Sequence, residues 1–235
     1  MYDRNRAQEL KIFSAYSVRN LFDTDTPYKV LRRFDEVISK AFEEMPELVS
    51  YIRSVGTASK MIETCVEEMN NYGYIGEAIV EKTNMRYLTN FCYFPLLKSE
   101  FAYEELCSYA GIYLNSEHIK NLEEYEEKLI KRQNGGWWSK GVQDIGYSVA
   151  HEVGHAIDSW LHISSSRELA LIYKVYPLAI SKYGAFSYKE FFAEAYAEYS
   201  TGESPRETAL AVKQLVDAAV LRERAKNKSE NLYHP

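Results

Sequence analysis

The chain has 235 residues, of which 46% are hydrophobic and 26% charged, the proportions of a globular domain with its own core. The formal net charge is −6 and the sequence has no basic stripe, which argues against nucleic acid as a partner. No run of about 18 apolar residues occurs, so no membrane span is predicted.

The first half of the chain combines helical patterns with short β-prone runs. Its first six residues are polar and lack the apolar core of a secretory signal, so the sequence as written points to the cytoplasm. Amphipathic patterns predict helices over about 28–53 and 58–70. Between 72 and 115, glycines and a proline interrupt β-prone runs such as 78–81 and 111–114, which predicts a small sheet there. A helix capped by Ser116 should follow and end at Asn134-Gly135-Gly136.

The second half is predicted to be helical throughout. A long helix is expected over about 142–161, and a capping box formed by Ser165 and Glu168 should open the next helix, which ends before Pro177. Further helices are expected at about 187–200 and from the Ser204-Pro205-Arg206-Glu207 start signal onward. The pattern predicts one mainly helical α+β domain, with an N-terminal lobe over about 1–162 and a helical C-terminal lobe over about 163–235.

The most informative segment is His151-Glu152-Val153-Gly154-His155, within the long predicted helix. Residues four apart on a helix lie one above the other, so the two histidines can direct ring nitrogens at one ion. Glu152 is placed to take a proton from a water bound to that ion. The segment therefore predicts one Zn²⁺ per chain and a hydrolytic reaction.

A catalytic zinc needs a third protein ligand, for which there are two candidates. His162 lies seven residues past His155, about 10 Å further along the helix axis, too far for a bond of about 2 Å, so we interpret it as a helix-end histidine. Glu190 shares a helical face with Glu194 and Glu198, and the alanines of this helix allow a close approach to the motif helix. Glu190 is thus the predicted ligand, and Glu194 the acceptor for a ligand histidine. The alternative is an acidic, solvated helix face.

The motif, Tyr183-Gly184 and the segment Glu190-Phe-Phe-Ala-Glu-Ala-Tyr together resemble the family of the anthrax lethal factor catalytic domain and the bacterial Pro-Pro endopeptidases. The resemblance covers roughly residues 145–200 and is not evident in the first hundred residues. It implies a zincin-like, two-lobed metallopeptidase of the gluzincin type, with Glu190 as the third zinc ligand. It also implies secretion, if a leader has been removed.

The resemblance assigns further roles at the site. Tyr183 would donate a hydrogen bond to the oxyanion, with Tyr188 as the alternative donor, or Tyr183 could simply pack in a loop. Glu152 would pass its proton to the leaving amine. Asp158 matches the family pattern after the second histidine, which implies a place next to the ligands or in helix packing.

Such enzymes bind their substrate in a cleft, for which Trp137, Trp138 and Tyr113 are candidate walls, although the two tryptophans can equally anchor their loop. The predicted function is a zinc-dependent endopeptidase that hydrolyses peptide bonds in a peptide or protein through a zinc-bound water activated by Glu152. The alternatives are a catalytically silent binding module on a zincin fold, such as a phage or toxin accessory protein, or a helical scaffold with a chance motif. The cleaved bond and the oligomeric state are not specified by the sequence.

Overall fold

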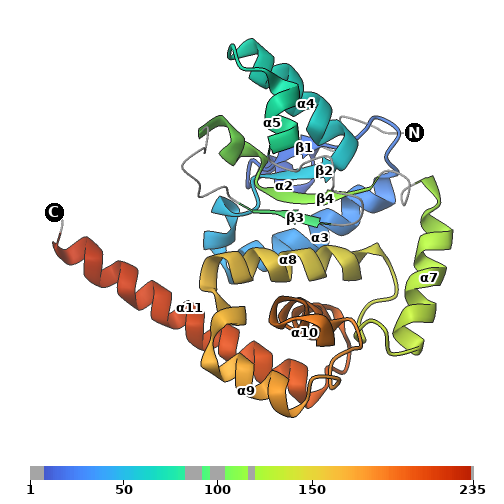
Figure 1. Ribbon diagram of the computed structural model, residues 1–235, viewed down its shortest axis with the longest axis vertical. Helices are drawn as coiled ribbons and strands as arrows, with labels where there is room; N and C mark the ends of the chain where they lie inside the picture. The colour runs from blue at the N-terminus through green and yellow to red at the C-terminus, as the bar shows by residue number, and fades with distance from the viewer. Residues whose placement is uncertain (1–7, 83–91, 96–103, 116–119, 234–235) are drawn as a thin grey trace. The chain divides into compact units, whose positions relative to one another are not determined.

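The chain is mainly helical and carries one small mixed sheet, in agreement with the predicted α+β class. The computed structural model describes residues 8–82, 92–95, 104–115 and 120–233 (Figure 1). These residues fall into two compact units, Met1–Glu127 and Lys128–Pro235. The boundary differs from the one expected near residue 162, because the motif helix packs with the helix that carries Glu190 and belongs to the second unit.

The sheet of the first unit has four short strands in the order β1-β2-β4-β3. They are β1 (Arg19–Leu21), β2 (Ser54–Thr57), β3 (Cys92–Phe94) and β4 (Gly111–Leu114). β1, β2 and β4 are parallel, and β3 is antiparallel to β4. The strand predicted at 111–114 is therefore confirmed. Gly111 permits its close pairing with β2, since a Cβ there would meet the Ser54 carbonyl oxygen at 1.8 Å.

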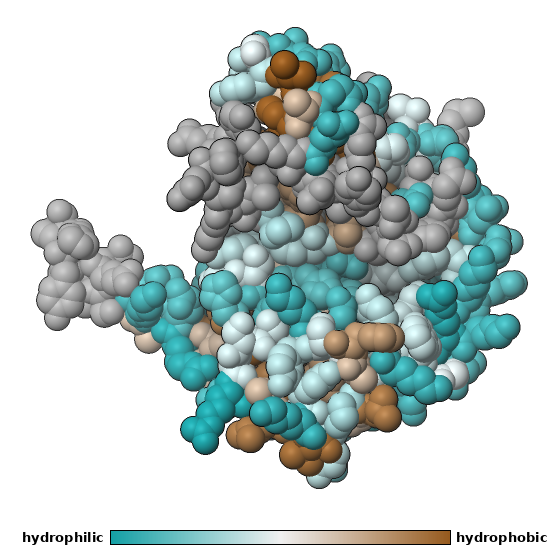
Figure 2. All heavy atoms as spheres, in the orientation of Figure 1, coloured by the Kyte–Doolittle hydropathy of each residue, from teal (hydrophilic) through white to brown (hydrophobic). Residues whose placement is uncertain are grey.

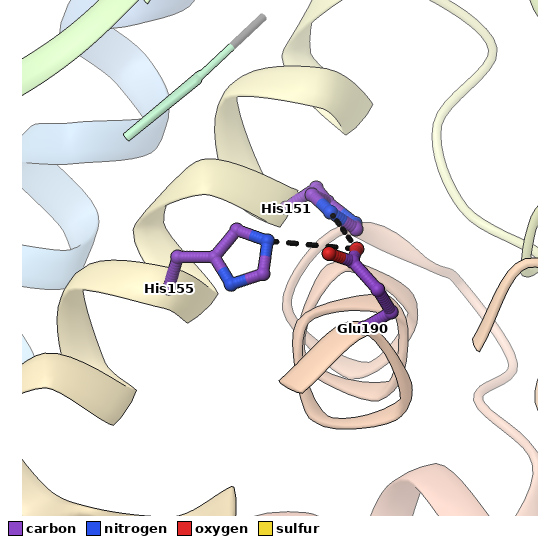
Figure 3. A group of neighbouring side chains, drawn as sticks. All are labelled: His151, His155 and Glu190. Atoms are coloured by element: carbon purple, nitrogen blue, oxygen red, sulfur yellow. Dashed lines mark hydrogen bonds and ion pairs between the residues drawn. The ribbon is translucent and has the colours of Figure 1, made fainter. Parts of the chain in front are cut away.

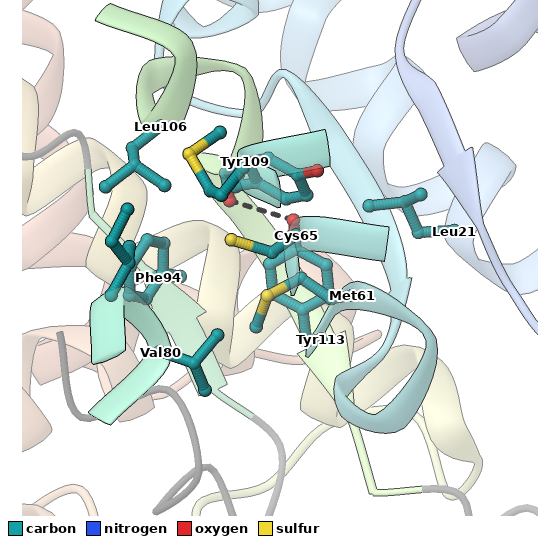
Figure 4. Close-up of a cluster of buried hydrophobic side chains, with 10 residues drawn as sticks. Leu21, Met61, Cys65, Val80, Phe94, Leu106, Tyr109 and Tyr113 are labelled. Atoms are coloured by element: carbon teal, nitrogen blue, oxygen red, sulfur yellow. Dashed lines mark hydrogen bonds between the residues drawn. The ribbon is translucent and has the colours of Figure 1, made fainter. Parts of the chain in front are cut away.

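Helices cover both faces of this sheet (Figure 1). They are α2 (Lys11–Ser14), α3 (Tyr28–Glu44), α4 (Ala58–Asn71) and α5 (Gly76–Lys82), with 3-10 turns at Pro46–Ser50 and Glu104–Tyr109. α4 and α5 contribute Met61, Cys65 and Val80 to a buried cluster that also holds Tyr109 and Tyr113 (Figure 4). The burial of these side chains contributes to the stability of the unit.

Two predictions for the first unit are wrong. The helix expected over 28–53 ends at Glu44, because Pro46 disfavours the helical conformation of Met45, whose φ is −136° and ψ 78°. The run 78–81 is part of helix α5 and not a strand. Gly76, Ile79 and Val80 are its buried residues, which is helical spacing, so the β-branched pair misled the prediction. The cap expected at Ser116 lies outside the described residues.

The second unit consists of helices (Figure 1). They are the second part of α7 (Leu122–Asn134), then α8 (Ile145–Leu161), α9 (Arg167–Val175), α10 (Tyr188–Thr201) and α11 (Glu207–Tyr233), with 3-10 turns at Ile163–Ser165 and Gly184–Phe186. α8 begins later than expected because the Asp144 side chain accepts from the Gly146 N–H at 2.7 Å and caps it. The cap of α9 is Ser166 and not Ser165, since its Oγ accepts from the Leu169 N–H.

α8 and α10 lie against each other through small residues. A Cβ built on Gly154 would lie 2.9 Å from Ala193 Cα, so the absence of a side chain sets the distance between the two helices. Phe191 and Phe192 of α10 are fully buried. Near the start of α11, Arg206 binds the buried carboxylate of Glu198 and also donates to the carbonyl of Ile180. Within the described part of the chain, no helix has both the length and the apolar character needed to cross a bilayer.

Candidate metal centre

Two helices of the second unit bring His151, His155 and Glu190 together (Figure 3). The histidines lie one turn apart on α8, as their spacing predicts, with ring centroids 4.8 Å apart. Glu190 lies in the first turn of α10, where the Ser187 side chain caps the helix by accepting from the Glu190 N–H. One ligand atom from each residue lies within 4.8 Å of the other two, and this group could hold a metal ion.

The distances within the group suit a metal ion. Glu190 Oε2 lies 3.1 Å from His151 Nε2 and 3.6 Å from His155 Nε2. An ion that holds its donors tetrahedrally, at about 2.0–2.1 Å, separates them by about 3.3 Å. The two distances to the carboxylate oxygen lie on either side of that value, and they are therefore compatible with one ion bound between the three side chains.

The outer nitrogen of His151 is held by Glu194, as predicted. His151 Nδ1 lies 3.0 Å from Glu194 Oε1, and the Glu194 side chain is only 1% exposed. An ionised carboxylate only accepts hydrogen bonds, so Nδ1 carries the proton in this pair. In the neutral ring the lone pair is then on Nε2, which faces Glu190 and His155.

Glu194 itself is fixed by two residues that the sequence analysis did not identify, Tyr147 and Ser139. The Tyr147 hydroxyl donates to Glu194 Oε1 at 2.8 Å and the Ser139 N–H donates to Oε2 at 2.7 Å. The Ser139 hydroxyl also donates to the Glu194 carbonyl, at 2.8 Å. Tyr147 precedes His151 by one helical turn on the same face, so this spacing could have indicated that Tyr147 lies near the metal group. Ser139 is distant in sequence from Glu194, and no local pattern indicates the contact.

The pKa values reflect the close contact of these groups. Burial opposes the charged form of His151, but hydrogen bonds to Glu190 and Glu194 outweigh it and raise the His151 pKa to about 10. Burial also works against the charge of Glu190, yet hydrogen bonds from His151 and His155 hold the Glu190 pKa well below its ordinary value. Without an ion, the site therefore keeps a charged carboxylate beside a protonated histidine.

Glu152 and Tyr183 lie next to this group. Glu152 is buried and follows His151 on α8. The ring of Tyr183 lies 5.9 Å from that of His151, whereas Tyr188 packs against Tyr173 at 4.5 Å. Burial, followed by the negative charges of Glu190 and Glu152, raises the pKa of Tyr183. Its hydroxyl thus stays protonated at neutral pH and is able to donate a hydrogen bond.

Asp158 and His162 lie outside the group. Of the two places considered for Asp158, the structure supports helix packing, because its carboxylate accepts from the Ser164 N–H at 2.6 Å and from the Ser164 hydroxyl at 2.7 Å. It thereby fixes the turn after α8. His162 is exposed and ends α8 in the left-handed conformation, with φ 53°, which agrees with its interpretation as a helix-end residue.

The three residues suggested as cleft walls differ in their surroundings. Tyr113 is 0% exposed in the core of the first unit, with its hydroxyl bonded to Ser54 and to the Tyr109 carbonyl, so it packs in that core and cannot line a cleft. Trp138 is half-buried, beneath the Arg132 guanidinium and 6.2 Å from the Tyr147 ring. Trp137 is 39% exposed.

Comparison with known proteins gives no match to a family model, to a curated protein or to a solved structure. The candidate site is therefore defined by the geometry of its own side chains.

Proposed function

We propose that the protein is a zinc-dependent endopeptidase with a zincin-like fold, in which His151, His155 and Glu190 hold one zinc ion. The observation that carries this proposal is the convergence of two ring nitrogens and one carboxylate oxygen within 4.8 Å. Two nitrogens and one oxygen are a donor set typical of catalytic zinc, which keeps a fourth position open. The hydrogen bond from His151 Nδ1 to Glu194 is the support that such ligands require.

Each residue beside the ligands has a role in peptide hydrolysis. Zinc, when held by these three residues, would supply the chemistry of a Lewis acid, which lowers the pKa of a water and polarises the scissile carbonyl. Glu152 accepts the proton of the attacking water and delivers it to the leaving amine. Tyr183 donates its hydroxyl hydrogen to the oxygen on which negative charge develops. Glu194 keeps the His151 ring in the orientation that binding needs.

Two measurements test the proposal. Elemental analysis of the purified protein should give one zinc per chain, and Glu190→Ala should lose most of it. The wild type should cleave members of a random peptide library, while Glu152→Gln keeps zinc and loses cleavage by at least about 100-fold.

The outcomes separate the possible functions. Stoichiometric zinc without cleavage of any peptide would point to a binding module that retains the metal centre. Absence of zinc would leave the motif as a coincidence within a helical scaffold. Full retention of zinc in Glu190→Ala would assign the third ligand to another residue.

A further inference from the structure

Exposed hydrophobic side chains of the second unit gather on α9 and in the turns before α10, where Figure 2 shows brown patches. They are Leu171, Val175, Tyr176, Leu178 and Phe186. Phe186 is 67% exposed and lies in the 3-10 turn that directly follows Tyr183. It differs from the others because its ring is in contact with both Trp137 and Tyr183.

Trp137 and Phe186 form an aromatic ledge. Their ring centroids lie 5.9 Å apart at an interplanar angle of 62°. Two large aromatic side chains left in water at one place are a feature of binding surfaces. Trp138 is not part of the ledge, since Arg132 and Tyr147 pack on it.

The backbone beneath the ledge is fixed. The Tyr183 N–H donates to the Trp137 carbonyl at 2.9 Å, and the Lys182 N–H donates to the Gly136 carbonyl at 3.0 Å. The Gly184 N–H donates to the Ser181 hydroxyl, and the Tyr173 hydroxyl donates to the Ala185 carbonyl. The backbone that carries both rings is therefore ordered before any ligand arrives, which lowers the entropy lost on binding.

Tyr183 connects the ledge to the metal centre. The centroid of its ring lies 6.0 Å from that of Phe186 and 5.9 Å from that of His151. An extended peptide advances about 3.3 Å per residue. The two separations together therefore span at most about three or four residues of a peptide whose scissile bond would lie at the metal.

We infer that the ledge is a subsite for an apolar or aromatic side chain of the polypeptide substrate, within about four residues of the scissile bond. This inference rests on the proposed endopeptidase function, since the metal centre fixes where the peptide backbone passes. The recognition is hydrophobic contact and edge-to-face stacking on Trp137 and Phe186. An enzyme with this ledge discriminates against peptides that carry small polar residues at the same position.

The test compares peptide libraries with Phe or Ser fixed at one position and all others randomised. The wild type should favour Phe over Ser by about 10- to 100-fold in kcat/KM at one position. In Phe186→Ala and in Trp137→Ala this ratio should approach one. Leu221→Ala is the matched control, because Leu221 is 68% exposed on α11 and should leave the ratio unchanged.

A binding measurement separates the ledge from catalysis. Fluorescence anisotropy with labelled Phe and Ser libraries on Glu152→Gln should give the same preference without cleavage. If the protein cleaves peptides but Phe186→Ala and Trp137→Ala leave the Phe-to-Ser ratio of kcat/KM unchanged, the ledge assignment is overturned while the proposed peptidase function is supported. The wild type could cleave no peptide while Glu152→Gln still binds the Phe library more tightly and loses this preference when Phe186 or Trp137 is also replaced by alanine. That result would support the ledge as a binding site and contradict the proposed peptidase function. No preference for Phe in either measurement overturns the ledge.

Discussion

His151 and Glu194 share a hydrogen bond of 3.0 Å between Nδ1 and Oε1, in a part of the second unit that solvent hardly reaches. A carboxylate this deeply buried is stable only if several donors satisfy it, and His151 is one of three. The orientation of a metal-ligand candidate is thus fixed by the same contacts that stabilise the fold.

Tyr147→Phe removes the second of these donors. We expect zinc affinity to fall about 10-fold, because Glu194 is then free to turn away from His151, and stability to fall by about 1–3 kcal/mol. Competition with a chromophoric chelator measures the first effect and urea unfolding the second. Tyr109→Phe is a suitable control, since the buried Tyr109 also donates to a carboxylate, that of Glu68 in the first unit. Equal zinc affinity in the two variants would argue against a role for Tyr147 at the metal.

The pH dependence of stability should differ between the metal-free and the zinc-bound protein. In the metal-free protein the His151 pKa is about 10, above its unfolded value of 6.5. The stabilisation by charged His151 is therefore fully present below pH 6.5 and is lost as the pH rises through about 10. Zinc takes the neutral ring and must displace this proton, so its affinity should rise over the same range.

Thermal unfolding between pH 6 and about 10, with and without zinc, tests this difference. The metal-free midpoint should fall with rising pH, while the increase in midpoint caused by zinc should grow. His151→Gln removes the titrating ring and shows the contribution of all other groups. If the unfolding midpoint of the metal-free wild type depends on pH no more than that of this variant, the expected contribution of His151 is contradicted.

Gly154→Ala should destabilise the protein although alanine favours helices. Helix propensity alone would stabilise by about 1 kcal/mol. The new Cβ, however, would lie 2.9 Å from Ala193 Cα, so the helices must separate, at a cost of about 1–3 kcal/mol. Zinc affinity should fall as well, because Glu190 moves with α10. A variant more stable than the wild type in urea would show that the helices adjust freely.

Asp158→Ala should lower stability without weakening metal binding. The substitution leaves the Ser164 N–H and hydroxyl without their acceptor, at a cost of about 1–3 kcal/mol. Zinc stoichiometry and affinity should equal those of the wild type, since the hydrogen bonds of the Asp158 carboxylate go to Ser164 and not to the metal group. If the variant is as stable as the wild type but binds zinc more weakly, Asp158 supports the metal ligands and does not serve helix packing.

The parts of this protein that were predictable from sequence are those governed by helical spacing. His151 and His155 on one helix, and Glu190 with Glu194 on another, follow from residue intervals of four. The small residues of both helices predicted their close approach, which Gly154 and Ala193 confirm.

Contacts between segments distant in sequence were not predictable. Ser139 reaches Glu194 from a loop, and no periodicity records that contact. β1 and β2 are only a few residues long, too short to give an alternating pattern. Tyr113 was placed at a cleft because its strand was predicted, but a strand pattern does not tell which face its tyrosine takes, and here that face is the core.

Arg206 links the start of the last helix to residues far earlier in the chain. It binds Glu198 at the end of α10 and donates to the carbonyl of Ile180, three residues before Tyr183. The guanidinium thus connects the segment that leads to Tyr183 with α10, the helix that carries Glu190. Replacement of this arginine by lysine, which has a single ammonium group, would weaken the support of both segments without altering any residue of the proposed metal site.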